Sequence, residues 1–224
     1  MSIINITDLR KVYRGENDTV EVLSGLNFDV AAGEIVSVEG ASGEGKSTLL
    51  NILGTIDTAS SGQVLIDDAD ITVMKEREKE RFRSKTLGFI FQHHYLLPDF
   101  TVLENVTMPL LILRKSILSA RREAENILEK VGLSHRMDHF PSQISGGEMA
   151  RAGVARALVG GKTLILADEP TGNLDRKNSD KLADLLWKLQ SDFKFTLLIV
   201  THDQELASRV PTRYRLMQGI LNKI

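Results

Sequence analysis

The chain has 224 residues, of which 42% are hydrophobic and 26% are charged, as is ordinary for a globular protein large enough to bury a core. Its formal net charge is −2. The chain therefore lacks the strong basic field that holds nucleic acid, and no nucleic-acid partner is expected. The absence of cysteine excludes disulfides and thiolate metal sites, and the longest apolar runs are too short to span a bilayer.

Residues 3–39 are predicted to form short strands separated by turns. Tyr13 is expected in a turn before Gly15, where its ring could stack on an adenine base. The expected strands are residues 3–6, 20–23, 26–30 and 35–38, with Ser24-Gly25 dividing the second strand from the third.

The segment Gly40–Thr48 carries the first chemistry. Its sequence matches the pattern G-x-x-x-x-G-K-[ST] in full, after an apolar strand and before a predicted helix, which disfavours a plain glycine-rich turn. The glycines let backbone N–H groups surround phosphates, while Lys46 would reach the β- and γ-phosphates and Ser47 would bind Mg²⁺. The ATP-binding residues predicted here are Gly40, Ser42, Gly43, Gly45, Lys46, Ser47 and Thr48.

The middle of the chain is predicted to be mostly helical. Residues 75–85 are interpreted as a solvated helix because their acids offset their bases, and residues 87–91 as a buried strand. Residues 93–160 then become helical, with Ser119 expected to cap a helix that Gly132 ends.

The run Ser145-Gly146-Gly147-Glu148 has the pattern of a capping box, with Ser145 as N-cap and Glu148 at the third helical position. The helix is expected over residues 149–159, and its N-terminal N–H groups and dipole would attract an anion. A plain cap on a surface helix is the alternative if the run is taken alone.

Two apolar runs, residues 163–167 and 195–200, have the composition of central parallel strands buried on both faces. Asp168 and Glu169 follow the first run, where Asp168 would hold Mg²⁺ through water and Glu169 would act as general base. His202 follows the second run and is expected to contact the γ-phosphate. Gln92 could bind both Mg²⁺ and water, although alone it would be interpreted as a loop residue.

Taken together, these motifs resemble the ATP-binding subunit of an ABC transporter, and the resemblance covers essentially the whole chain. It implies that Tyr13 stacks on adenine and that Glu169 and His202 are catalytic, together with Gln92 and Lys46. By the same resemblance, Gly40–Thr48 is the Walker A motif, Gln92 the Q-loop, Asp168 the Walker B residue and Asp175 the D-loop residue. The signature motif, which would act on a second copy of the chain, comprises Ser145, Gly146, Gly147 and Glu148.

The resemblance implies an α/β fold, namely a P-loop NTPase (RecA-like) core with an N-terminal antiparallel β subdomain and an inserted α-helical subdomain. As a single ABC ATP-binding domain over residues 1–224, it would divide into a core of residues 1–92 and 160–224 and a helical subdomain of residues 93–159. The implied cofactors are ATP and Mg²⁺.

Residues 91–101, followed by Glu104-Asn105-Val106, resemble the lipoprotein-releasing (Lol) ATPases. The segment Ala167–Asp175 resembles their wider group, which includes macrolide-export and cell-division relatives. This implies a homodimer on ATP binding, two integral-membrane permease subunits and lipoprotein as an indirect cargo. It also implies a peripheral position on the cytoplasmic face of the inner membrane. Because no membrane domain follows in this chain, a separate subunit is expected.

Three alternatives stay open: a related macrolide-export or cell-division ATPase, a soluble ABC ATPase outside transport, and a P-loop kinase. The sequence also departs from the family pattern at several places. Glu39 and Glu44 bring carboxylates to the phosphate loop, Met149 and Ala150 stand where polar residues are usual, and Gly153 in mid-helix should cost about 1 kcal/mol relative to alanine.

Overall fold

Two long antiparallel strands, β1 (Ser2–Arg14) and β2 (Thr19–Ala31), open the chain in the computed structural model, which describes residues 1–15 and 18–224. The expected division at Ser24-Gly25 is wrong. The pairing of β1 with β2 shifts register there, between Leu9↔Leu26 and Lys11↔Leu23, and Gly25 takes a φ of 72°. A bulge at a glycine bends a strand without ending it, so one continuous β2 replaces two short strands.

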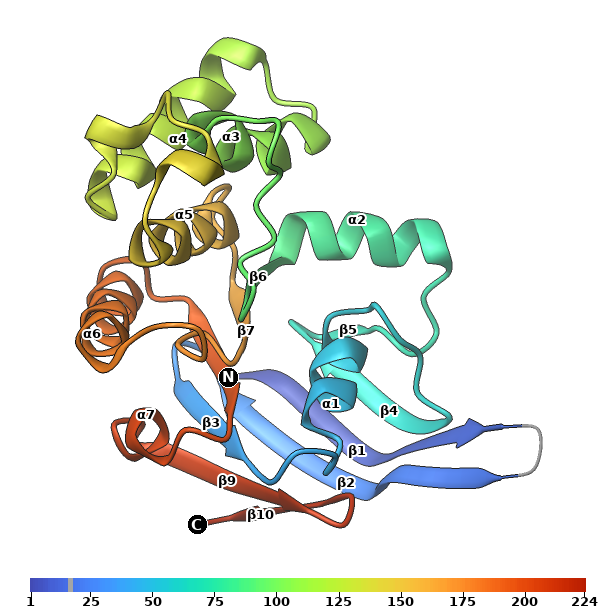
Figure 1. Ribbon diagram of the computed structural model, residues 1–224. Helices are drawn as coiled ribbons and strands as arrows, with labels where there is room; N and C mark the ends of the chain where they lie inside the picture. The colour runs from blue at the N-terminus through green and yellow to red at the C-terminus, as the bar shows by residue number, and fades with distance from the viewer. Residues whose placement is uncertain (16–17) are drawn as a thin grey trace. The chain divides into compact units, whose positions relative to one another are not determined.

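The chain divides into two compact units, the first comprising Met1–Arg83 with Phe195–Ile224 and the second Ser84–Lys194. In the first unit, β1 and β2 form an antiparallel sheet with β4 (Ser61–Ile66) and β5 (Ala69–Asp70), in the order β2-β1-β4-β5 (Figure 1). This sheet is the predicted antiparallel β part of the fold.

The first unit also contains the strands that hold the phosphate loop. Strand β3 (Ile35–Glu39) lies between β8 (Thr196–Thr201) and β9 (Thr212–Met217) and is parallel to both, while β10 (Ile220–Lys223) pairs antiparallel with β9. Val38 and Val200 are fully buried, so β3 and β8 are central strands, as their apolar sequences predicted. The helices of this part are α1 (Lys46–Leu53), α7 (Gln204–Ser208) and α2 (Glu76–Thr86), whose last residues belong to the second unit.

In the second unit, β6 (Leu87–Phe91) and β7 (Leu164–Asp168) pair in parallel. Helix α5 (Gly146–Leu158) packs against β6, and a Cβ at Gly88 would collide with the carbonyl of Ala157, so glycine is required for this close approach. The other helical elements of this unit are α3 (Val102–Ile112), α4 (Ile117–Lys130), η1 (Ser134–Arg136), η2 (Pro141–Gln143), α5 (Gly146–Leu158) and α6 (Arg176–Phe193) (Figure 1).

Two predicted helix starts are corrected. The N-cap of α4 is Ser116, whose side chain accepts the N–H of Ser119, so Ser119 lies inside the first turn. Helix α5 begins at Gly146, because Ser145 as N-cap makes the two glycines its first residues. The predicted end at Gly132 agrees with its φ of 73°, which is typical of the residue after a helix.

The predicted helical subdomain, residues 93–159, lies wholly within the second unit, together with β6, β7 and α6. Its boundaries against the core at residues 92 and 160 stay a prediction. In the described part of the chain, no helix has both the length and the apolar character needed to cross a membrane.

Candidate functional site

The phosphate loop, Gly40–Gly45, runs from the carboxyl end of β3 to the first residue of α1. The ammonium group of Lys46 donates to the carbonyls of Gly40 and Ala41, at 2.8 Å each. The loop therefore folds around Lys46, which is only 8% exposed. A Cβ at Gly40 would lie 2.6 Å from the Leu216 carbonyl oxygen, and Gly45 has a φ of 97°. Backbone packing therefore requires two of the motif's glycines.

The N-terminus of α1 fits a phosphate group. Its N-cap is Gly45, which has no side chain to accept the first N–H groups, and no acid lies in the first turn. Ser47, predicted to bind Mg²⁺, is exposed in this turn. Unsatisfied N–H groups at a helix N-terminus, beside a lysine, are donors suited to phosphate oxygens.

The two unusual acids beside the loop have structural partners. Glu39 is 5% exposed and accepts from Nε of Arg213 at 2.8 Å, on the neighbouring strand β9. The carboxylate of Glu44 accepts the backbone N–H of Gln218 at 2.5 Å. Gln218 has a φ of 51°, in the turn that joins β9 to β10. Glu44 therefore fixes a hairpin turn, a role that the sequence did not predict.

His202 lies at the same sheet edge as the phosphate loop. Strands β3 and β8 are parallel with Glu39 paired to Thr201, so Gly40 and His202 each follow an aligned residue. Asp203 then caps α7, and its own N–H donates to the Thr201 hydroxyl at 2.9 Å. The structure thus places His202 at the sheet edge from which the phosphate loop starts.

Tyr13 lies in strand β1, paired with Val20, and not in the expected turn. Its hydroxyl donates to Asp57 at 2.6 Å, and 43% of the residue is exposed. This bond raises the pKa of Tyr13 above its ordinary value, with a smaller opposite effect from Thr48 of α1. The predicted adenine-stacking ring therefore lies beside the phosphate loop's helix.

In the second unit, the predicted catalytic carboxylates and glutamine meet at one edge. Strands β6 and β7 are parallel with Phe91 paired to Asp168, so Gln92 and Glu169 follow aligned residues. The Asn173 amide donates to the Gln92 carbonyl at 2.9 Å. Glu169 has a φ of 46°, a conformation that is unusual outside glycine and that often marks functional positions.

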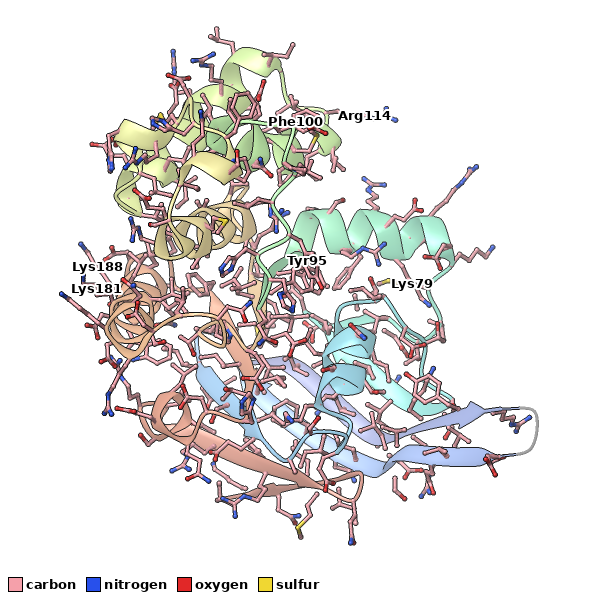
Figure 2. All side chains as sticks on the ribbon, viewed as in Figure 1. Lys79, Tyr95, Phe100, Arg114, Lys181 and Lys188 are labelled. Carbon is pink, nitrogen blue, oxygen red and sulfur yellow. The ribbon has the colours of Figure 1, made fainter. Side chains whose placement is uncertain are left out.

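The segment after Gln92 is fixed by two residues whose roles sequence reasoning missed. Arg156 of α5 donates to the carbonyls of His94 and Tyr95, at 2.5 Å each, where both residues have positive φ (Tyr95 is labelled in Figure 2). Asn105 of α3, which is 1% exposed, accepts the N–H of Leu97 at 2.7 Å. A polar residue inside the apolar run of α3 is the signal that could have identified Asn105.

The predicted capping box at the start of α5 is present. The Ser145 hydroxyl accepts the N–H of Glu148 at 3.3 Å, and the Glu148 carboxylate accepts both the N–H and the hydroxyl of Ser145 at 2.8 Å. These bonds, followed by that from Arg136 at 2.9 Å, lower the pKa of Glu148 to about 2. The first turn of α5 therefore carries an ionised carboxylate at neutral pH.

Asp175, the predicted D-loop residue, is the N-cap of α6. Its carboxylate accepts the backbone N–H of Asn178 at 2.9 Å and the side-chain amide of Asn178 at 2.7 Å, and these bonds lower its pKa. The Asn178 side chain lies beside Gly147, where a Cβ would be 3.4 Å from its Oδ1. The signature and the D-loop are thus neighbours within the second unit.

Comparison with known proteins identifies the family of this chain. The model of the ABC transporter family matches residues 23–172, well over half of the chain. The chain belongs to the ABC transporter family. It is 44% identical over 222 residues to the lipoprotein-releasing system ATP-binding protein LolD of Hahella chejuensis, covering 99% of this chain and 96% of the relative. The protein of the same name from Myxococcus xanthus is 44% identical and covers 98% of both chains.

Among solved structures, the ATP-binding cassette MJ0796, in a dimeric post-hydrolysis state bound to ADP and Pi, matches with a TM-score of 0.89. It is 34% identical, and the match covers 98% of each chain. The predicted α/β P-loop fold is therefore confirmed, as is the predicted class of protein, an ATPase subunit of an ABC transporter similar to the Lol group.

Proposed function

We propose that this chain binds ATP with Mg²⁺ and hydrolyses it to drive the release of lipoproteins from a membrane. The observation that carries the proposal is the phosphate loop wrapped around Lys46, next to an α1 N-terminus that has no side-chain cap. The lipoprotein part of the proposal is supported by the names of relatives that are 44% identical along nearly their full length.

In the first unit, the N–H groups of α1 and Lys46 bind the β- and γ-phosphates, Tyr13 stacks on the adenine, and His202 contacts the γ-phosphate. The residues predicted to donate oxygens to Mg²⁺ stay part of the proposal: Ser47, which is exposed, in the first unit, and Asp168 and Gln92 in the second. When bound, the ion would neutralise the charge that develops on the phosphate oxygens.

Glu169 acts as general base in this proposal and takes a proton from the attacking water, which bonds to the γ-phosphorus as the bond to ADP breaks. The support is its position directly after the β7 strand, one residue beyond Asp168 and at the same edge as Gln92. Ser145 and Gly147 would face the γ-phosphate held by a second copy, consistent with the dimeric state of the MJ0796 cassette.

The assembly would pair two copies of this chain with two integral-membrane permease subunits. Its place would be the cytoplasmic face of the inner membrane, with lipoproteins as the cargo of the permeases. The exposed side chains of Tyr95, Leu97 and Phe100, in the segment after Gln92, are the proposed contacts with the permeases (Figure 2).

The first test uses Glu169→Gln. Removal of the base should lower ATP hydrolysis at least about 100-fold while ATP binding stays intact, and an ATP-bound dimer should accumulate in size-exclusion chromatography. Glu129→Gln, on the exposed face of α4, is the matched control and should hydrolyse ATP normally. Turnover by Glu169→Gln at the wild-type rate would remove Glu169 as the base.

The second test concerns the cargo. The copurifying membrane subunits are reconstituted with this chain in vesicles that contain a lipoprotein, and release is followed after adding ATP. ATP-dependent release supports the proposal, whereas hydrolysis without release would overturn the cargo. Phosphate transfer to a small molecule instead of water would overturn the ATPase mechanism.

A further inference from the structure

The hydroxyl of Tyr13 belongs to a small hydrogen-bonded cluster outside the phosphate loop. Asp57, in the segment after α1, accepts from Tyr13 through Oδ2 and from the ammonium of Lys11 through Oδ1, both at 2.6 Å. Lys11 also donates to the Thr58 carbonyl at 2.8 Å, and its Nζ lies 4.5 Å from the centre of the Tyr13 ring. One carboxylate thus joins a buried lysine to a partly exposed aromatic ring.

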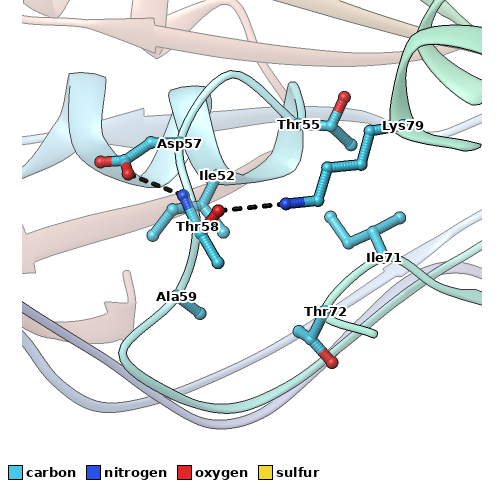
Figure 3. A pocket seen from close by; sticks show the side chains of 8 residues that line it. All are labelled: Ile52, Thr55, Asp57, Thr58, Ala59, Ile71, Thr72 and Lys79. Carbon is cyan, nitrogen blue, oxygen red and sulfur yellow. Dashed lines mark hydrogen bonds between the residues drawn. The ribbon is translucent and has the colours of Figure 1, made fainter. Parts of the chain in front are cut away.

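The segment that carries Asp57 is itself held in place. The N–H of Thr58 donates to Asp57 Oδ1 at 2.6 Å, and the Thr58 hydroxyl accepts from Lys79 of α2 at 3.0 Å, beside a small hollow (Figure 3). Arg83 donates to the Thr55 carbonyl at 2.7 Å. Asp57 therefore presents its second oxygen to Tyr13 from a fixed position.

The charges agree with this arrangement. Burial acts to raise the pKa of Asp57, but the hydrogen bonds from Lys11 and Tyr13 outweigh it and hold the pKa below its ordinary value. Asp57 is therefore an ionised acceptor at neutral pH, and a hydrogen bond from a hydroxyl to a carboxylate is among the stronger kinds.

We propose that Asp57 and Lys11 are positioning residues for adenine recognition, which they serve by holding the Tyr13 ring in the orientation that stacks on the base. The inference rests on the proposed function, in which Tyr13 contacts adenine. A free tyrosine on a strand exchanges between rotamers, and fixing one of them on binding costs conformational entropy. The Asp57–Lys11 pair fixes the ring before nucleotide arrives.

The test compares ADP with inorganic pyrophosphate, because both ligands need the phosphate loop but only ADP carries the base. Binding to the full chain is measured by calorimetry, with pyrophosphate as a competitor. Tyr13→Phe keeps the ring and removes only its hydroxyl, so ADP should bind about two- to tenfold more weakly while pyrophosphate binding stays unchanged. Asp57→Ala should give a similar loss.

The double variant Tyr13→Phe/Asp57→Ala should lose no more affinity for ADP than either single variant, since both changes remove one interaction. Asp70→Ala is the matched control. Asp70 is another carboxylate of the first unit with two side-chain partners, Gln63 and Thr72, but with no aromatic partner. The Asp70→Ala variant should bind ADP with the same affinity as the wild type.

The outcomes separate the inference from its basis. If Tyr13→Ala weakens ADP binding but Tyr13→Phe does not, the ring contacts the base and the positioning role is overturned. If Tyr13→Ala leaves ADP binding unchanged, the adenine contact itself is overturned. If Asp57→Ala weakens ADP and pyrophosphate equally, Asp57 supports the phosphate loop and does not position the ring.

Discussion

The N-termini of α1 and α5 are both candidate anion sites, and they are built in opposite ways. Helix α1 begins after Gly45, which has a φ of 97° and no side chain to cap the first N–H groups. Helix α5 begins after Ser145, whose hydroxyl caps the helix and is itself held by Glu148. The first end therefore has no side chain that satisfies its donors, whereas at the second the N–H of Glu148 is already satisfied by Ser145.

This difference suggests that the two helix ends have different roles in phosphate binding. In the proposed function, helix α1 binds phosphate in a single copy of the chain, because no side chain caps its first N–H groups. The Ser145 hydroxyl must give up its bond to Glu148 before it can donate to a phosphate, and that carboxylate repels an anion. Arg136, 2.9 Å from Glu148, offsets this charge. A phosphate already bound to another copy would supply the remaining driving force.

The variant Ser145→Arg is the strongest test of these different roles of α1 and α5. Its bulk should block the approach of a second copy's γ-phosphate, so hydrolysis should fall about 100- to 1000-fold, the range seen when one donor to a transition state is removed. The affinity of the single chain for ATP, measured by calorimetry, should change by less than about twofold, because the hydrogen bond of Ser145 at the start of α5 takes no part in that binding.

Lys46→Ala is the counterpart at α1 and should abolish both binding and hydrolysis, since it removes a charge that no other residue of the loop supplies. If Ser145→Arg also loses binding by the single chain, the two ends do not differ in the way proposed, and the run at residues 145–148 is an ordinary structural cap.

A smaller effect is expected from the pair Arg136 and Glu148. Arg136→Ala leaves the Glu148 charge without its nearest cationic partner, so hydrolysis should fall about tenfold by electrostatic repulsion of the phosphate. Adding Glu148→Gln removes that charge and should restore most of the rate. Steady-state hydrolysis of the two single variants and the double variant measures the coupling. Equal losses in Arg136→Ala with and without Glu148→Gln would contradict the electrostatic explanation.

The sequence predicted the phosphate loop before α1 and the Ser145 cap before α5, but not the surroundings of either. The motif Gly40–Thr48 and the capping box are local patterns, so their backbone could be anticipated from neighbouring residues. The partner of Glu44 is Gln218, and that of Asp57 is Lys11, each far away in the chain. Strand pairing and packing bring such residues together, and no local sequence pattern indicates those long-range contacts.

The same limit explains the errors in the elements. Ser24-Gly25 has the composition of a turn, but pairing with β1 makes it a bulge in a continuous strand. Ser119 and Ser116 are both good caps, and only the packed helix decides between them. Ala150 departs from the family's usual polar residue, yet it is 2% exposed, so an apolar side chain suits its place in α5.

Acid should also distinguish the two helix ends. The pKa of Glu148 is lowered from 4.5 to about 2 in the folded chain, so its carboxylate stabilises α5 above about pH 4.5 and this contribution is lost as the pH falls toward 2. Glu148→Gln should therefore lower the free energy of unfolding by about 1–3 kcal/mol at pH 7 and by progressively less below pH 4.5. Helix α1, with no acid in its first turn, contributes no such dependence.

Urea unfolding of both proteins between pH 7 and pH 3, followed by the fluorescence of Trp187 in α6, measures this difference in the second unit. A gap between the two proteins that is independent of pH would show that hydrogen bonding, and not ionisation, sets the contribution of Glu148.

The smallest effect concerns a glycine in each helix. Gly153 in mid-α5 is buried, but a Cβ there would lie 3.8 Å from the Cβ of His94, an ordinary contact. Gly153→Ala should therefore raise the free energy of unfolding by about 1 kcal/mol, since alanine restricts the unfolded chain and favours the helix. The Trp187 signal in urea measures it, because α5 and α6 belong to the same unit.

Gly45→Ala at α1 should do the opposite. Its φ is 97°, and a Cβ would lie 2.8 Å from Cγ1 of Val22, so strain and collision should lower stability by at least about 1 kcal/mol, as circular dichroism in urea would record. A loss of stability in Gly153→Ala as well would mean that α5 needs a closer approach to the His94 segment than a methyl group allows. In that case both glycines would be required, Gly153 by the close approach and Gly45 also by its backbone conformation.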